Sequence, residues 1–236
     1  MVLVVATGGE WGERPEDLAP DESLGDRRRR EANASAAALG IHRVAWLGYE
    51  DSGMTGWEQN QNPGSFFQAP LVEAAERLAA ILREESADVL TTYDWHGVYG
   101  HPDHVKVHRV AVYAAELAGT QRVLEATMNR DLIVQLRQAA RQMGEAGAEA
   151  EADFDPNAPA DDGNPFGSTA EEITLAVDVR DYLPQKRAAL SCHASQISET
   201  SFFMKMPDEV FAMAFGTEWY IERGAPTGGP RPGWIF

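Results

Sequence analysis

The sequence predicts an α/β protein in which a mostly parallel sheet is covered by helices on both faces. Two observations lead to this fold class. Strand-like runs alternate with longer segments whose apolar residues recur at helical spacing. The strand-like runs are apolar throughout, which is typical of parallel strands buried on both faces. With 44% hydrophobic residues, the chain can bury a sizeable core, and we expect one domain over residues 1–236.

The first two strand–helix pairs lie in the N-terminal third of the chain. The run VLVVA at 2–6 is the first predicted strand. An alanine-rich helix at 28–39 follows a polar loop, and Gly40 is expected to end it. The second strand is predicted at 42–47. Residues 69–85 then repeat apolar side chains at the spacing of a second helix.

Two further pairs continue the same alternation. A strand at 87–93 precedes a helix at 103–118, which Gly119 is expected to close. A strand at 122–128 precedes a helix at 129–143. These pairs extend the predicted parallel sheet to four strands.

The alternation breaks after residue 143. Residues of about 144–170 are rich in acid, Ala, Gly and Pro, and we expect a flexible acidic insertion there, with a lid as the alternative. A strand at 172–179 and a helix at 182–197 resume the pattern. The C-terminal GGPRPGW is expected to be an irregular tail.

Charge and cysteine content exclude several classes of function. The 37 acidic residues outnumber the 20 basic ones, for a net charge of −17. Such a surface repels nucleic acid and anionic membranes, so we expect neither as a partner. No apolar run approaches the roughly 18 residues of a membrane span, and the first residues lack a basic signal region. The single cysteine, Cys192, fits a reducing cytoplasm, which is the expected location.

Polar clusters follow the first three predicted strands. They are TGGEWGE after the first, GYEDSGM after the second and YDWHGVYGHPDH after the third. Because ligands bind at the carboxyl ends of parallel strands, we expect these loops to form one site.

The HPDH sequence at the start of the third helix has two interpretations. Asp103 can cap the helix and Pro102 can fix its entry, which leaves His101 and His104 free for a ligand. An adjacent carboxylate can also hold an imidazole in one tautomer. The alternative is a capped helix start with two solvent-facing histidines.

Other polar residues are open to both structural and functional interpretation. Arg28 and Glu31 lie in DRRRREAN, where a run of arginines usually forms a solvated face, although one arginine can clamp a polar ligand. Asp51 is either a turn residue or a carboxylate for sugar hydroxyls. His108, four residues after His104, has the spacing of a paired ligand but is expected to pack in the helix. His96 is expected at the surface.

Four stretches resemble the PIG-L/LmbE-like de-N-acetylases, a family that includes enzymes of mycothiol metabolism. They are VVATGGEWGE, the Arg28-x-x-Glu31 helix start, WLGYEDSGM and TTYDWHGVYGHPDHVKVHR. The resemblance covers roughly residues 2–130, and weakly HASQ at 193–196. It implies a Rossmann-like fold and a zinc-dependent hydrolase that removes an acetyl group from an N-acetylglucosamine-type substrate or cleaves a related amide.

The resemblance also implies roles for individual residues. Amide hydrolysis needs a Lewis acid and an activated water, donors at the developing oxyanion and an acid for the leaving amine. The implied partner is a small amino-sugar or amide substrate, and a homo-oligomer is allowed. The implied site comprises His104 as a Zn²⁺ ligand, His101 as general acid and oxyanion partner, Asp103 as its orienting carboxylate, Tyr99 beside the oxyanion, and Arg28 and Asp51 on the sugar or its aglycone.

One family motif has no counterpart in this sequence. The resemblance places the other zinc ligands and the general base in an A-H-P-D-D-E motif on the first strand, which is absent here. We therefore expect the first strand to be missing and the chain to be truncated at its N-terminus and impaired, unless Glu10, Asp94 or His96 substitutes as a ligand. The alternatives are a non-catalytic sugar-binding or regulatory relative, and a metal-free hydrolase that uses His101 and Asp103.

Overall fold

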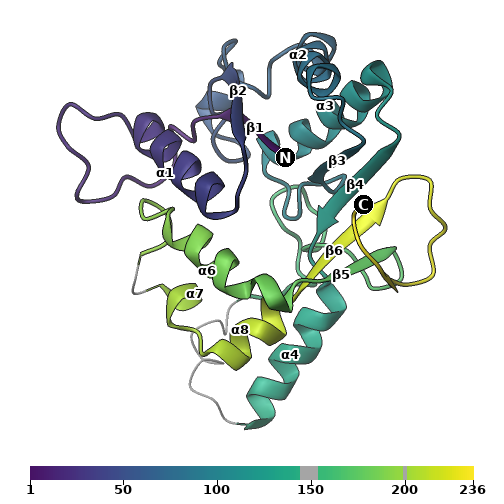
Figure 1. Ribbon diagram of the computed structural model, residues 1–236. Helices are drawn as coiled ribbons and strands as arrows, with labels where there is room; N and C mark the ends of the chain where they lie inside the picture. The colour runs from purple at the N-terminus through teal and green to yellow at the C-terminus, as the bar shows by residue number, and fades with distance from the viewer. Residues whose placement is uncertain (144–153, 199–200) are drawn as a thin grey trace.

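The computed structural model describes residues 1–143, 154–198 and 201–236, and it is an α/β structure (Figure 1). Within these residues no helix is long and apolar enough to cross a membrane. In chain order the elements are β1 (Val2–Thr7), α1 (Leu24–Ala38), β2 (Arg43–Tyr49), η1 (Glu58–Gln61), α2 (Leu71–Glu84), β3 (Val89–Tyr93), α3 (Pro102–Ala118), β4 (Arg122–Thr127), α4 (Arg130–Met143), β5 (Leu175–Asp178), η2 (Arg180–Tyr182), α6 (Leu183–Ser191), α7 (Phe202–Lys205), α8 (Asp208–Phe215), β6 (Thr217–Glu222) and β7 (Arg231–Pro232).

The predicted strand–helix alternation is confirmed as far as α4, with changes at the helix ends. Helix α1 begins before the predicted Arg28 because the Ser23 hydroxyl accepts a hydrogen bond from the Asp26 N–H, at 3.0 Å. Helix α3 ends at Gly119, which adopts the left-handed conformation with φ 76° that the sequence predicted for a closing glycine.

The α/β fold class is confirmed, and three of the five strand pairings among the described residues are parallel, but the strands form two sheets and not the single one expected. Strands β1 and β2 pair in parallel, and the second sheet has the order β3-β4-β6-β5-β7. In the second sheet β6 pairs antiparallel with both β4 and β5. The C-terminal tail is irregular as expected except at β7, whose two residues pair with β5. These pairings join segments that lie far apart in the sequence, so no local sequence pattern predicted them.

Helices cover the sheets in two groups (Figure 1). Helices α2 and α3 pack side by side, and their apolar faces form the main core with Ala6, Leu47 and Phe66. Helices α1 and α6 pack against each other, so a C-terminal helix closes on the first helix of the chain. A smaller core of Leu124, Leu175 and Val177 lies at the second sheet.

The structure describes the second half of the acidic segment, and the flexibility expected for the segment stays a prediction. Residues 144–153 lie outside the described residues. Residues 154–170 form turns that pack on the loop after β3: the Asp161 N–H donates to the Tyr99 carbonyl at 3.2 Å, and the Gly167 N–H donates to the Val98 carbonyl at 2.7 Å. Because backbone groups make these contacts, the acidic side chains do not prevent the packing. The single domain remains a prediction.

Candidate active site

A cavity of about 870 Å³ lies between β1 and β3. Within the described residues β1 pairs only with β2, and β3 only with β4, so the cavity is bounded by one edge of each sheet. Its lining includes residues 3–7 of β1, residues 91–93 of β3, and side chains from the loops after β1, β2 and β3. The predicted convergence of these three loops is therefore confirmed.

The start of α3 places two histidines beside this cavity. His101 is the N-cap of α3, and its Nδ1 accepts a hydrogen bond from the Asp103 N–H at 3.1 Å. The cap is thus His101 and not Asp103, because the chain turns into the helix one residue before Pro102. The His101 and His104 rings lie 4.8 Å apart, and the Tyr99 ring meets His104 edge-on at 5.2 Å.

The capping contact selects the tautomer of His101. A backbone N–H can only donate, so Nδ1 carries the lone pair and the ring proton of neutral His101 lies on Nε2. Burial lowers the pKa of His101, while Asp51 and Asp161 oppose that shift. Near neutral pH, His101 is therefore an uncharged imidazole with an N–H donor on the nitrogen that the cap leaves free.

His104 differs from His101 because its free ring nitrogen is an acceptor with a lone pair and not an N–H donor. Its Nδ1 lies 3.3 Å from the Gly97 carbonyl, which can only accept, so the proton of the neutral ring lies on Nδ1 and the lone pair on Nε2. The ring stacks on Tyr93 at 4.1 Å. Burial and the neighbouring His101 lower the pKa of His104 to about 4. A neutral imidazole whose other nitrogen is held by a carbonyl is typical of a metal ligand.

Asp103 is directed away from His101, although the resemblance assigned it to orient that ring. Its carboxylate accepts hydrogen bonds from the Ser52 N–H, at 3.1 Å, and from the Ser52 hydroxyl. Burial raises the pKa of Asp103 to about 6, against the lowering effect of Ser52. The carboxylate therefore anchors the loop after β2 to α3. The backbone N–H of Asp103, and not its carboxylate, orients the His101 ring.

The two residues expected to bind the sugar both line the cavity. Arg28 Nη1 donates to the Gly9 carbonyl at 2.7 Å, while its buried Nε has no hydrogen-bond partner. Asp51 accepts the N–H groups of Trp11, at 3.0 Å, and Gly53, at 2.9 Å. Asp51 thus joins the loops after β1 and β2 and also faces the cavity.

The structure adds lining residues that sequence analysis did not assign to the site. His193 and Gln196 line the cavity, and burial lowers the pKa of His193. Buried Glu31 on α1 holds their turn, because its carboxylate accepts the Ser195 N–H at 2.8 Å and the Ser195 hydroxyl at 2.6 Å. The weak HASQ resemblance was the only signal for this contact in the sequence.

The described residues do not fit a zinc site with three protein ligands. They contain no group of three His, Cys, Asp or Glu side chains that could hold a metal ion. The substitutes suggested for the missing ligands are engaged elsewhere: Glu10 accepts the Asp51 N–H at 3.1 Å, and Asp94 accepts the Val98 N–H at 2.8 Å. A catalytic zinc takes three protein ligands and a water, and His104 supplies one.

His108 does not complete the site either. Its Nδ1 lies 3.1 Å from the Tyr93 carbonyl and 3.9 Å from a carboxylate oxygen of Glu125. The interpretation of His108 as a packed helix residue is therefore favoured over a ligand pair with His104.

His104 and Asp103 are expected to give opposite dependences of stability on pH. His104 titrates at about 4 in the fold and at 6.5 when unfolded, so the unfolded chain binds more protons between these values and acid destabilises the fold. Asp103 titrates at about 6 in the fold and at 3.8 when unfolded, so acid stabilises the fold in nearly the same window. Each effect is on the order of 3 kcal/mol at its full extent.

Urea unfolding between pH 4 and 7 separates the two groups. Asp103→Asn is expected to lose stability as the pH falls from 6.5 towards 4, while His104→Gln gains stability as the pH falls from 6. Equal pH profiles for the two variants would contradict both assignments.

Comparison with known proteins relates this geometry to a family. Residues 1–115 match the family model of PIG-L, GlcNAc-PI de-N-acetylase. The chain is 37% identical to a 1D-myo-inositol 2-acetamido-2-deoxy-alpha-D-glucopyranoside deacetylase of a Nocardioides species, over 93% of this chain and 81% of that relative.

Two solved structures share the fold at low sequence identity. The A40926 pseudoaglycone deacetylase Dbv21 has a TM-score of 0.53 and 14% identity, over 93% of this chain and 83% of that one. GalB, a 4-carboxy-2-hydroxymuconate hydratase from Pseudomonas putida, has a TM-score of 0.51 and 16% identity, over 95% of this chain and 84% of that one. Since the fold carries two different activities, the chemistry must be argued from the site.

Proposed function

This chain belongs to the PIG-L de-N-acetylase family, and on that premise we propose that it hydrolyses the acetamide of an N-acetylglucosamine moiety linked to inositol. The observation that carries the proposal is the pairing of an N–H donor on His101 with a lone pair on His104 beside one cavity. The relative from Nocardioides is a deacetylase of such a substrate.

The residues around His101 supply donors for the reaction. Attack of water on the acetyl carbon places negative charge on the carbonyl oxygen, which needs preorganised donors. The Nε2–H of His101 is one such donor. The Tyr99 hydroxyl is the second, and because burial raises the pKa of Tyr99, it keeps its proton at neutral pH.

Cleavage then releases an amine and acetate. The C–N bond breaks, the acyl carbon keeps the oxygen of water, and the amine nitrogen takes up a proton. His101 serves as the general acid for that nitrogen once its Nδ1 has taken up the proton that the attacking water loses, which requires Nδ1 to release its hydrogen bond from the Asp103 N–H. Its lowered pKa makes the protonated form a stronger acid than an exposed histidine.

The same cavity also contains groups that suit a hydroxyl-rich ligand. The unpartnered Nε of Arg28 and the carboxylate of Asp51 can bind sugar or inositol hydroxyls. Trp11 and Trp57 line the same cavity and offer apolar ring faces to a sugar ring. Few precisely placed polar groups among apolar walls are typical of small-molecule sites.

We propose His104 as a ligand of Zn²⁺, which when bound would polarise the amide and activate water. The described residues supply too few further donors, so these 236 residues alone are expected to hold zinc weakly and to be impaired. His104 is nevertheless suited to the role, with a neutral ring and a fixed tautomer.

The proposal is tested with 1D-myo-inositol 2-acetamido-2-deoxy-α-D-glucopyranoside as substrate. Free amine and acetate are expected to appear in equal amounts and to increase with added zinc. N-acetylglucosamine, which lacks the inositol, is the control for recognition of the second ring. Saturable calorimetric binding without amine release at any zinc concentration would favour the non-catalytic sugar-binding relative. Absence of both binding and turnover would contradict both functions.

A further inference from the structure

Val98, directly before Tyr99, has a backbone conformation that its residue type rarely adopts. Its φ is 71°, in the left-handed region, which disfavours a β-branched side chain. Such a conformation persists only where the surrounding structure holds it, and it is concentrated at functional sites.

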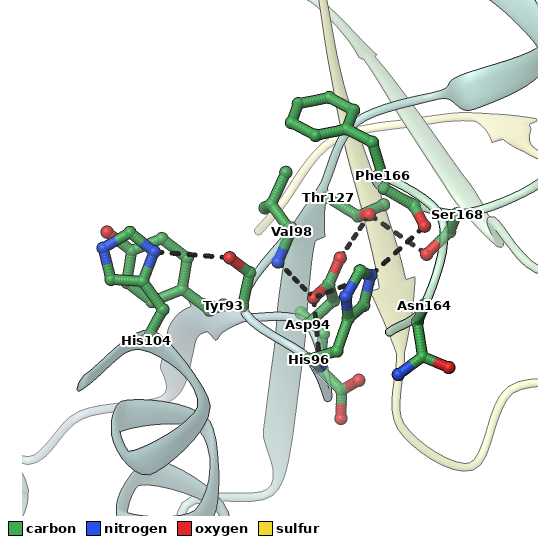
Figure 2. A network of polar contacts seen from close by, with 12 residues as sticks. Tyr93, Asp94, His96, Val98, His104, Thr127, Asn164, Phe166 and Ser168 are labelled. Atoms are coloured by element: carbon green, nitrogen blue, oxygen red, sulfur yellow. Dashed lines mark hydrogen bonds and ion pairs between the residues drawn. The ribbon is translucent and has the colours of Figure 1, made fainter. Parts of the chain in front are cut away.

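Both backbone polar groups of Val98 are bound by buried partners. Its N–H donates to Asp94 Oδ1 at 2.8 Å, and its carbonyl accepts the Gly167 N–H at 2.7 Å. Asp94 has 0% exposure, and its Oδ2 accepts the Thr127 hydroxyl at 2.5 Å. The Thr127 hydroxyl in turn lies 3.0 Å from Ser168 Oγ (Figure 2). One hydrogen-bonded network thus ties β3, β4 and the segment after residue 154 to Val98.

His96 supports the same segment from within the loop. It was expected at the surface, but it is 1% exposed. Its Nε2 lies 3.2 Å from the Gly167 carbonyl, and its Nδ1 lies 3.5 Å from Asp162 Oδ2. Figure 2 shows its ring between the Asp94 carboxylate and the strand of chain that carries Ser168.

Residues 161–168 also contact the other side of Tyr99. The Asp161 N–H donates to the Tyr99 carbonyl at 3.2 Å. At Gly100 a Cβ would lie only 2.5 Å from the Asp162 backbone nitrogen, so the two chains approach as closely as a glycine allows. The backbone of residues 98–100 is therefore held from both ends by the same segment.

We infer that Asp94, His96, Thr127 and residues 161–168 form a clamp that holds Val98 in the left-handed conformation and thereby aims the Tyr99 ring at His101 and His104. The Tyr99 ring lies 6.2 Å from the His101 ring and 5.2 Å from the His104 ring. If Val98 relaxed to an extended conformation, the direction of the chain at Tyr99 would change and the hydroxyl would leave the cavity. The clamp residues are positioning residues, because their contacts are with the loop.

The clamp is tested without substrate by Thr127→Val, which removes one donor to Asp94 and keeps the side-chain shape. Exchange of the Val98 and Gly167 amides, measured by NMR, is expected to accelerate at least tenfold, while amides of α2 are unchanged. The Tyr99 phenol, followed by its ring-carbon resonance, is expected to titrate closer to 10 because it becomes less buried. Ser168→Ala is the milder variant should Thr127→Val fold poorly.

Controls separate positioning from general destabilisation. Asn157→Ala changes an exposed residue of the same segment, outside residues 161–168, and is expected to leave both signals unchanged. Val98→Asn in the Thr127→Val background is expected to restore much of the protection, because asparagine tolerates the left-handed region. Unchanged amide exchange and Tyr99 titration in folded Thr127→Val and Ser168→Ala would overturn the inference.

The role of Tyr99 towards substrate rests on the proposed function, and a kinetic measurement tests that link. Thr127→Val is expected to lower kcat with little change in KM, and to add little to the effect of Tyr99→Phe. Altered NMR signals without any turnover in the wild-type protein would refute the proposed function and leave the clamp in place. Normal turnover with unaltered signals would refute the clamp alone.

Discussion

After dialysis against zinc-free buffer, the 236-residue protein is expected to retain far less than one zinc ion per chain. The physical reason is the donor set, since the described residues contain His104 but no group of three His, Cys, Asp or Glu side chains around a common point. Zinc content is measured by mass spectrometry on dialysed protein, and affinity by competition with a chromophoric chelator. Turnover should then depend on zinc added well above the protein concentration.

Two variants test whether the weak site is the one at α3. His104→Ala is expected to abolish the remaining zinc affinity and the zinc-dependent turnover together. His42→Ala removes an exposed histidine that contacts the N-terminal amine at 2.9 Å, and it is expected to change neither. One zinc per chain after dialysis would contradict the assignment. It would mean that Glu10, Asp94 or His96 leaves its present hydrogen bonds to bind the metal.

Replacing His101 with alanine is expected to lower kcat roughly 100- to 10,000-fold at saturating zinc, the range of a general acid. KM should change little if His101 acts mainly on the developing charge and the leaving amine. Amine release is followed under substrate saturation. The loss should be present across the pH range, since alanine cannot supply the proton at any pH.

The N-cap role of His101 requires a matched variant. His101→Ala also removes the acceptor for the Asp103 N–H, which by itself costs about 1 kcal/mol of stability. Asparagine is a good N-cap residue and has no acidic proton, so His101→Asn is expected to retain the melting temperature while losing the same kcat. Near-normal turnover of His101→Asn would return His101 to a purely structural role at the start of α3.

The prediction of the elements succeeded where the signal was local. Apolar runs and helical periodicity located β1 to β4 and the helices between them, because each pattern reflects which side of a single element is buried. Gly119 indicated the end of α3 for a similar local reason, because glycine adopts the left-handed backbone conformation of a helix end without a steric penalty. The loops that carry Asp51 and His101 line one cavity as predicted, although β2 and β3 belong to different sheets.

Pairing across the sheet was not predictable in the same way. Strand β6 lies between β4 and β5, and its place depends on partners about forty to one hundred residues away, as the pairs Asp178 with Thr217 and Leu124 with Glu222 show. Backbone N–H and C=O groups are alike in nearly all residues, so the local sequence does not identify the strand with which a segment pairs. The antiparallel strand and the division into two sheets therefore appear only in the tertiary structure.

The sequence by itself determined which chemical groups are available at the strand ends, and the tertiary structure decided what each group contacts. HPDH specified a helix start with two imidazoles, but their tautomers follow from the Asp103 N–H and the Gly97 carbonyl. The carboxylate of Asp103 binds Ser52, which lies 51 residues earlier. A buried polar group must find a partner wherever the fold provides one, and that partner is set by distance in space and not by spacing along the chain.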